Sequence, residues 1–355
     1  MYFMVTALRQ RVSKGFYNRL IFFMRKNNIL FLLFLSLIFF ACSSEKKEEG
    51  KKSEVTAKAQ SAPYELLLVA NKDWLKTETG KAVKDMVETP VEVLPQSEPS
   101  FRVTTIEPRS FDGVFRLYSN IVIVDVDKKY TKPEVRKAVN QYARPQTIIY
   151  MCSPDNAGLM TLVQESSHFV LGEFNKNEFA REVAGLSKKY SGNVMRQAKK
   201  QFGLEIKAPE DVDDIKEGKD FFWAAASKRA FRQNVCIYTL PLQHMTLEMM
   251  VAARDSIMKI NIPGDREDQW METDSRTVLP DVVNINTQTV AVMRGLWGMR
   301  HDAMGGPFVS YYFPDSANNR IIVAEGFVCA PEEKKKPIMR QLEAALQTLV
   351  KSDSK

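Results

Sequence analysis

A short apolar run near the start of the chain limits what its first 41 residues can form. Residues 29–41 contain a single polar side chain, and these 13 residues are fewer than the about 20 that a membrane-spanning helix needs. Arg25 and Lys26 precede the run, and Cys42 follows it. A basic segment, a short apolar core and a small residue before the cleavage point are typical of a secretory signal peptide. We therefore expect residues 1–41 to be a signal peptide and the folded protein to follow it.

The residues that close this run indicate how the mature chain is held. Ala41 followed directly by Cys42 is the cleavage pattern of a bacterial lipoprotein. We therefore expect Cys42 to be lipidated. Since stable anchoring takes more than one acyl chain, we expect several acyl groups on this residue, with palmitate among them. Lipoprotein signals usually have leucine where this chain has Phe39, so an ordinary signal peptide or a short membrane anchor is the alternative. We expect translation to begin at Met24, just before the basic pair.

The charge of the mature chain argues against one class of partner. Six of the 50 Lys and Arg residues lie in residues 1–41, which hold no acidic residue, so 44 basic residues remain against 43 acidic ones. A nearly neutral protein has no overall field that attracts nucleic acid. We expect no nucleic-acid partner, and we expect contact with the membrane through the lipid on Cys42.

Residues 42–63 have the composition of a lipidated tether. They are charged and nearly free of apolar side chains, and such segments bury too little surface to fold. The acidic residues at 45–49 resemble the signal that sends Bacteroidetes lipoproteins to the cell surface. We expect an outer-membrane lipoprotein, and both a periplasmic and a surface-exposed orientation stay open.

Residues 64–202 alternate between short apolar runs and helical patterns, which predicts an α/β layered unit with partly parallel strands. Pro133 suits the first turn of one predicted helix. Asn175, with Glu178 three residues later, fits a capping box. The expected strands are 64–70, 101–106, 121–126 and 147–152, and the expected helices are 80–87, 110–118, 132–142, 155–170 and one or two within 173–201.

Residues 203–355 predict an α+β subdomain with long antiparallel hairpins and a C-terminal helix. Gly305-Gly306 and Asn318-Asn319 lie at expected turns, where positive φ angles are tolerated. The fold class of the whole chain is therefore mixed α+β, with an N-terminal α/β layered unit followed by a mainly antiparallel sheet with flanking helices. The expected strands are 221–227, 234–240, 287–300, 308–313 and 320–329, and the expected helices are 246–260 and one that includes 338–349.

Cysteine and histidine usage argues against a metal site. Three cysteines remain, Cys152, Cys236 and Cys329, and an odd number cannot all pair in disulfides within the chain. We therefore expect them to be small buried side chains. A single disulfide between two of them is the alternative. No cysteine pair has metal-ligand spacing, and the three histidines are far apart. No glycine-rich phosphate loop follows a predicted strand. We expect no cofactor.

One segment of the C-terminal part carries a family resemblance. Residues 294–331 contain RGLWGMRHDAMGGPFVSYYF and NNRIIVAEGFVCAP. They resemble a family of uncharacterised Bacteroidetes lipoproteins, classed as a domain of unknown function, and the likeness covers most of the chain. Its most distinctive residues are Arg294–Trp297 and Met304–Pro307. The resemblance implies a location and a class of protein, and it implies no activity.

The predicted hairpin within this segment is the first candidate for ligand binding. Trp297, Arg300, His301 and Asp302 place a cation, an imidazole and a carboxylate within a few residues of an aromatic ring. Such a set suits an anionic or sugar-like ligand. No serine or cysteine nucleophile stands at a recognisable spacing, so we predict no catalytic residue. A bulged hairpin whose tryptophan packs in the core is the structural alternative.

Polar residues that follow the N-terminal strands are the second candidate. Ligands bind outside the carboxyl ends of parallel strands, although helix caps use the same residue types. The candidates are Asp73, Asp125, Asp127 and Asp155, with Asn71 and Ser153 beside them.

Taken together, the sequence predicts a membrane-anchored envelope lipoprotein that works as a binding or interaction module, with an envelope protein or a glycan as partner. An envelope hydrolase or glycan-active enzyme is one alternative. A structural subunit of an outer-membrane complex is the other.

Overall fold

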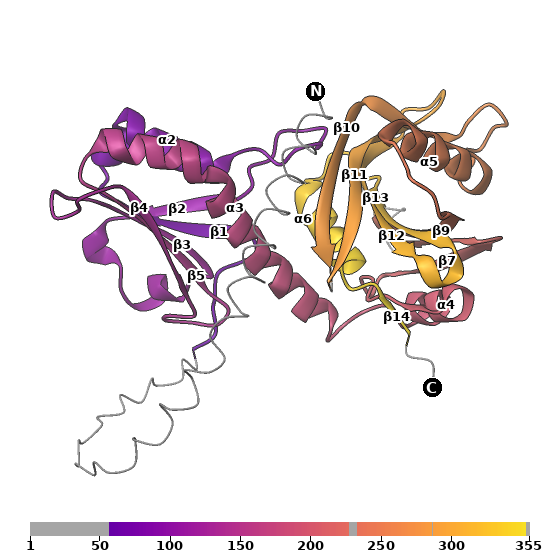
Figure 1. Cartoon of the computed structure of the whole chain (residues 1–355), viewed down its shortest axis with the longest axis horizontal. Coiled ribbons are helices and arrows are strands. Elements are labelled where there is room, and N and C mark those ends of the chain that lie inside the picture. The colour runs from indigo at the N-terminus through magenta and orange to yellow at the C-terminus, as the bar shows by residue number, and fades with distance from the viewer. Residues whose placement is uncertain (1–56, 227–232, 286, 353–355) are drawn as a thin grey trace, which may run out of the picture. The chain divides into compact units, whose positions relative to one another are not determined.

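The computed structural model describes residues 57–226, 233–285 and 287–352. The described residues belong to one compact unit, in which Figure 1 shows two large sheets with their helices. The predicted signal peptide, Cys42 and most of the predicted tether lie outside the described residues. No helix in the described ranges is long and apolar enough to cross a membrane.

The N-terminal sheet has five strands in the order β2-β1-β3-β5-β4. Strands β1, β2, β3 and β5 are parallel, whereas β4 pairs antiparallel with β5 at one edge. The central strands are almost wholly apolar because both faces of the sheet are covered. The strands are β1 (Glu65–Val69), β2 (Arg102–Ile106), β3 (Asn120–Val126), β4 (Glu134–Val139) and β5 (Thr147–Ser153).

Two helices cover one face of this sheet. α2 (Glu78–Glu88) and α3 (Asn156–Leu186) pack with Val122 and Ile149 in one core cluster. Side chains of the next residues along each strand point to the opposite face. There they pack against aromatic residues of short 3₁₀ turns, such as Phe115. The predicted α/β layered unit is confirmed.

The helix predicted at 132–142 is wrong. Residues Glu134–Val139 form β4, which pairs with β5 over its whole length. The guanidinium of Arg136 lies 5.8 Å from the ring centroid of Tyr150 on β5. Tertiary pairing overrides the local helical preference here, because the free edge of β5 offers a full row of backbone hydrogen-bond partners.

The capping box predicted at Asn175 and Glu178 is also wrong, because both residues lie inside α3. The helix begins instead after Asp155, which serves as its N-cap. The buried carboxylate of Glu178 accepts hydrogen bonds from the backbone N–H of Tyr64 at 3.0 Å and the side chain of Asn120 at 2.6 Å. Glu178 therefore fastens α3 to the N-terminal ends of β1 and β3.

The C-terminal sheet has seven strands in the order β10-β11-β12-β13-β9-β8-β7, and all neighbouring strands in it are antiparallel. The mixed α+β fold class with a large antiparallel sheet is thus confirmed. The two edge strands, β7 and β10, were not predicted, because their charged sequences lack a clear alternation of apolar residues. The strands are β7 (Val212–Gly218), β8 (Phe221–Ala226), β9 (Gln233–Pro241), β10 (Met271–Ile285), β11 (Gln288–Met299), β12 (Gly305–Asp315) and β13 (Arg320–Val328).

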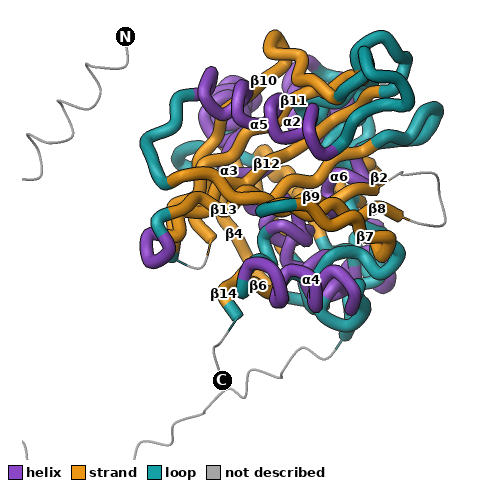
Figure 2. Tube along the Cα trace, turned by 90° about the vertical axis from the view of Figure 1, so that its right-hand side faces the viewer, coloured by secondary structure: helices purple, strands orange, loops and turns teal. Residues whose placement is uncertain are grey.

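Helices cover both faces of this sheet. α4 (Gly192–Phe202) and α6 (Lys336–Leu346) pack on the face that includes Tyr311, whereas α5 (Leu247–Asn261) packs on the face that includes Tyr312. Figure 2 shows α4 beside the small sheet of β6 (Leu204–Glu205) and β14 (Val350–Lys351). α4 therefore shares the core of the second sheet, although it precedes the predicted boundary at residue 202.

The two glycines expected at a turn have another role. Gly305 and Gly306 lie inside β12, and the residue with positive φ in the preceding turn is His301, at 56°. A Cβ atom on Gly306 would lie 1.9 Å from the carbonyl oxygen of Val328. Glycine is needed there because two backbones approach closely. In the next turn the prediction holds for Asn319, whose φ is 49°.

A fully buried ion pair connects α5 to the sheet. Arg254 on α5 and Glu325 on β13 have no exposed side-chain surface, and Arg254 Nη2 lies 2.8 Å from Glu325 Oε1. Ser310 donates to the other carboxylate oxygen at 2.7 Å, and Arg254 donates to Thr273 at 2.9 Å. The guanidinium lies 3.8 Å from the ring centroid of Phe308. Both charges are thus fully partnered, as buried charges must be.

We expect Arg254→Met to destabilise the protein by about 3–5 kcal/mol, because it leaves the Glu325 carboxylate buried without a cation. The double variant Arg254→Met/Glu325→Leu should recover most of this loss, since no unpaired charge remains. Urea unfolding of the purified protein measures both values. Arg276→Met is the matched control, because its ion pair with Asp274 is exposed and worth at most about 1 kcal/mol. A double variant no more stable than the single variant would contradict the argument.

Candidate functional site

The candidate site is built on the loop between α2 and β2, residues 89–100. The backbone N–H of Val91 donates to the carbonyl oxygen of Glu98 at 2.9 Å, which makes the loop a narrow antiparallel ribbon. Leu94, near its tip, packs against the core cluster of the C-terminal sheet. The loop thus brings residues of the N-terminal part to β11, β12 and α6.

The same loop caps α6. Lys335, at the N-cap position, makes no capping hydrogen bond with its own side chain. Glu98 replaces it, because its Oε1 accepts from the backbone N–H groups of Lys335 at 2.6 Å and Lys336 at 3.2 Å. A carboxylate here satisfies free N–H groups and interacts favourably with the helix dipole. The Glu98 side chain is buried, so the contact couples the loop tightly to the helix.

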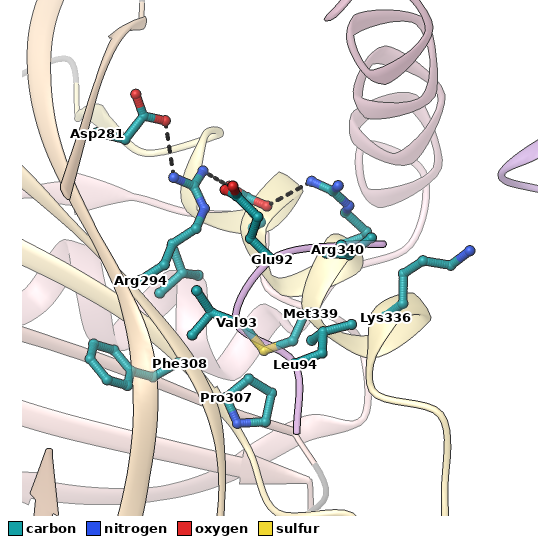
Figure 3. A pocket seen from close by; sticks show the side chains of 13 residues that line it. Glu92, Val93, Leu94, Asp281, Arg294, Pro307, Phe308, Lys336, Met339 and Arg340 are labelled. Carbon is teal, nitrogen blue, oxygen red and sulfur yellow. Dashed lines mark hydrogen bonds and ion pairs between the residues drawn. The ribbon is translucent and has the colours of Figure 1, made fainter. Parts of the chain in front are cut away.

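A cavity of about 180 Å³, called here the α6 cavity, lies between this loop, β11, β12 and α6. Figure 3 shows apolar side chains on one side and charged side chains on the other. Val93, at the tip of the loop, has a φ of 57°, which is rare for a β-branched residue and marks a strained segment. The residues that line the cavity include Glu92, Val93, Arg294, Lys336, Arg340 and Glu343.

Glu343 is the buried carboxylate of the α6 cavity. Its Oε1 accepts from Arg294 Nη2 and, at 3.0 Å, from the Tyr311 hydroxyl, and its Oε2 lies 3.3 Å from Arg340 Nη1. Burial by itself raises the pKa of Glu343, but the guanidinium groups of Arg294 and Arg340 outweigh burial and hold the pKa below its usual range. Glu343 is therefore ionised at neutral pH and is a poor proton donor.

Arg340 differs from Arg294 because its donors are not all used. Arg294 donates through both terminal nitrogens. Among the described residues, Arg340 donates only to Glu343, and its buried Nε has no acceptor. The Arg340 guanidinium lies 5.8 and 5.4 Å from the ring centroids of Tyr64 and Phe179, which restricts its orientation. An unpaired buried donor costs about 1–3 kcal/mol, and a ligand acceptor would remove that cost.

Lys336 adds a titratable cation to the same cavity. Its Nζ donates to the carbonyl oxygen of Pro99 at 2.5 Å. Burial lowers the pKa of Lys336 to about 8, and the charge of Arg340 acts in the same direction, whereas Glu98 partly offsets both. The positive charge of the cavity therefore decreases as the pH rises through about 8.

The first set of predicted ligand residues divides between two places. Trp297 and Asp302 line a groove of about 720 Å³ on the other side of the loop, next to Pro95 and Gln96. The Trp297 ring is almost fully buried and donates from Nε1 to a backbone carbonyl at 3.2 Å. It therefore packs in the core, as the structural alternative for this hairpin expected. A ligand role for this set stays a prediction.

Arg300 and His301 lie on the surface beside a different aromatic ring. The Arg300 guanidinium is 4.7 Å from the ring centroid of Trp270, and Lys259 Nζ is 3.9 Å from it. His301 Nδ1 lies 2.9 Å from a carboxylate oxygen of Asp268. The structure thus separates the cation and the imidazole from Trp297.

The second predicted set lies at one edge of the N-terminal sheet, because β1, β3 and β5 are adjacent and parallel. Each carboxylate already has a local partner in a turn or a helix cap. No group of three or more His, Cys, Asp or Glu side chains among the described residues is arranged to hold a metal ion. The partners are Lys76 for Asp73, Lys129 and Tyr130 for Asp125, the Lys129 backbone for Asp127, and the Gly158 backbone for Asp155.

None of the residues that line the α6 cavity was predicted as a ligand residue, and Arg294 entered the sequence analysis only through the family resemblance. Glu343 lies next to Leu342 on α6, a helix that is predicted from its apolar residues alone. A charged residue within an apolar stripe is a usable signal, since such a group needs a partner when it is buried. The identity of that partner depends on long-range contacts, so sequence spacing does not supply it.

Comparison with protein families divides the chain in two. Residues 191–348 match a domain of unknown function (DUF4837), and residues 59–186 match another domain of unknown function (DUF8532). These two parts of the chain are thus similar to domain families to which no function is assigned. No curated protein matches the chain.

Solved structures show only a distant likeness. A mutant of the protein Mog1 has 10% sequence identity and a TM-score of 0.28, with 43% of this chain and 92% of that chain covered. The Ran-binding protein Mog1p of Saccharomyces cerevisiae has 9% identity and a TM-score of 0.29, with 42% of this chain and 91% of that chain covered. Scores this low carry no argument about fold or function.

We expect Glu98→Ala to destabilise the protein by about 1–2 kcal/mol, the usual cost of removing a helix cap, because two backbone N–H groups lose their acceptor. Urea unfolding measures the loss. Glu92→Ala is the matched control on the same loop, since its exposed side chain caps no helix, and we expect a change within about 0.5 kcal/mol. Equal stability of the two variants would show that the cap is unimportant.

Proposed function

We propose that this protein is an envelope lipoprotein, anchored in the outer membrane through acyl chains on Cys42, whose folded part is a ligand-binding module. The sequence of residues 29–42 supports the anchor. Two domain matches without an assigned activity are compatible with a binding role. The α6 cavity is the site that we assign to the ligand.

The observation that carries this proposal is the buried Nε of Arg340, which has no acceptor among the described residues. The guanidinium is a planar fork of donors that matches a carboxylate with two parallel hydrogen bonds. Lys336 contributes a second cation nearby, and Val93 and Leu94 contribute apolar surface. We therefore propose a small carboxylate with an apolar body as the ligand class.

Glu92 acts in this proposal as an internal competitor. Its exposed carboxylate lines the same cavity, and Figure 3 shows it beside the charged groups of the site. It belongs to the strained tip of the loop, where a change of conformation relieves strain at Val93. A bound carboxylate would take the position that Glu92 approaches, so removing Glu92 favours the ligand.

The hydrolase alternative gains no support from this cavity. A hydrolytic mechanism with two carboxylates needs one of them protonated as a general acid. The buried carboxylate here is Glu343, and the two arginines that bind it keep it ionised. The ionised Glu343 carboxylate is therefore better suited to positioning the two arginines than to transferring a proton.

The anchor is tested by metabolic labelling with a clickable palmitate analogue. We expect label on the wild-type protein and none on Cys42→Ala, because Cys42 is the proposed acylation site. Cys329→Ala is the control, since Cys329 is a free and partly exposed cysteine elsewhere in the chain. Absence of label on the wild-type protein would contradict the lipoprotein proposal. Protease treatment of intact cells then separates the two orientations: cleavage indicates surface exposure, and protection indicates the periplasm.

The ligand site is tested with 4-fluorobenzoate as probe, followed by its fluorine NMR signal. We expect Arg340→Gln to weaken binding by about 10–100-fold, the value of one charge-assisted hydrogen bond, and we expect Glu92→Ala to tighten it. Affinity should fall as the pH rises through about 8, where Lys336 loses its charge, and this pH dependence should vanish in Lys336→Gln. Neutral 4-fluorobenzamide is the matched probe, and Arg276→Gln is the matched variant. Equal binding of the acid and the amide would contradict the proposal.

A further inference from the structure

A pocket of about 550 Å³, called here the basic pocket, lies where the folded part of the chain begins. It is formed by the first described residues, the loop after β4 and one side of α3. Ten of the described residues line it, and of these ten, four are cationic and none is acidic. The cationic residues are Lys58, Arg144, Arg181 and Lys188.

The first described residues are part of this pocket because hydrogen bonds hold them on the sheet unit. The backbone N–H of Ala59 donates to Arg144 O at 3.0 Å, and the N–H of Arg144 donates to Ala57 O at 2.8 Å. The N–H of Gln60 donates to Leu117 O at 3.0 Å. Lys58 and Ala59, which the sequence analysis assigned to the tether, therefore form one wall of the pocket.

The opposite walls are equally well fixed. The buried side chain of Gln146 accepts from the N–H of Tyr142 at 2.9 Å and donates to the carbonyl oxygens of Arg116 and Tyr118 at 2.7 Å each. These bonds hold the loop that carries Arg144. A site whose walls are fixed in advance loses little free energy to ordering when a ligand binds.

The cationic side chains of the pocket differ in how many partners they have. Arg181 donates to Glu178 at 2.6 Å and to the carbonyl oxygen of Ser61 at 2.8 Å, so its guanidinium is held in place. Among the described residues, neither Lys58 nor Lys188 forms an ion pair with an acidic side chain. The ammonium groups of Lys58 and Lys188 are therefore the cations of the pocket that no described acidic side chain neutralises.

Small residues on α3 leave room between the cations. Ala180, Ala184 and Gly185 line the pocket together with Arg181 of the same helix and Lys188, which follows the end of α3. A Cβ atom added at Gly185 would meet no other atom within 4 Å. The space is thus open to a group as large as a phosphate.

We infer that the basic pocket binds an anionic phosphate headgroup of the membrane in which the chain is anchored. This inference rests on the proposed lipid anchor at Cys42. Lys58 follows Cys42 by 16 positions, so even a fully extended chain separates them by no more than about 55 Å. The anchor keeps the pocket close to headgroups at high local concentration, and a phosphate carries the acceptor oxygens that lysine and arginine bind.

The test measures the reactivity of single lysines in the full lipidated chain. The protein is reconstituted into vesicles of phosphatidylcholine alone or with phosphatidylglycerol, and brief acetylation is quantified by mass spectrometry. We expect phosphatidylglycerol to slow acetylation of Lys58 and Lys188 by about fivefold, the factor for one lysine at an anionic surface. Lys199 and Lys200, which pair with Glu205 and Glu217, are the internal controls and should change little.

Inorganic pyrophosphate added to phosphatidylcholine vesicles separates the two sources of phosphate. Protection by phosphatidylglycerol, with or without protection by pyrophosphate, supports a headgroup site. Protection by pyrophosphate alone supports a phosphate site and overturns the membrane as its source. No protection by either, or equal protection of Lys199 and Lys200, overturns the inference.

A variant pair checks that the effect belongs to the pocket. Arg144→Gln should reduce the protection of Lys58 and Lys188, whereas Arg196→Gln on α4, which makes the same charge change outside the pocket, should not. Failure of the anchor is recognised separately, because the palmitate label is then missing while the response to pyrophosphate is still measurable.

Discussion

The carboxylate of Glu98 at the N-terminus of α6 is the contact on which the candidate site depends. It supplies the cap that α6 lacks and fixes the loop that forms one wall of the α6 cavity. α6 in turn presents Glu343 and Arg340, which organise the charges of the cavity. The N-terminus of α6 thus connects the loop and the sheet to the α6 cavity, the proposed ligand site.

Two groups of buried charge in this protein differ in how completely they are partnered. Arg254 and Glu325 have partners for both charges and no exposed surface, so they stabilise the position of α5 and leave nothing for a ligand. Around Glu343, the carboxylate is satisfied, but Arg340 keeps a buried donor that has no acceptor in the described part of the chain. Because an unmade hydrogen bond costs more than a made one contributes, the second group is the better place to look for binding.

The strongest parts of the fold were predictable because their pattern is local. The apolar runs of β3 and β5, the hairpin strands β11 to β13 and the amphipathic helix α6 follow their expected residues closely. β4 and β10 were missed, because an edge strand takes its hydrogen bonds from a neighbour and needs little apolar sequence of its own. The candidate ligand residues near Trp297 were adjacent in sequence, yet they divide between the core, a groove and the surface.

The mixed α+β class and most strand and helix positions follow from the amino-acid sequence alone, since hydrophobic periodicity acts over a few residues. The sequence also carries the proposed route to the membrane, in residues 29–42. Which charged side chains meet depends on the tertiary structure. Glu98 and Lys335 are 237 positions apart, and Arg254 and Glu325 are 71 apart. Partners at such separations are chosen by the packing of whole elements, and no local pattern records that choice.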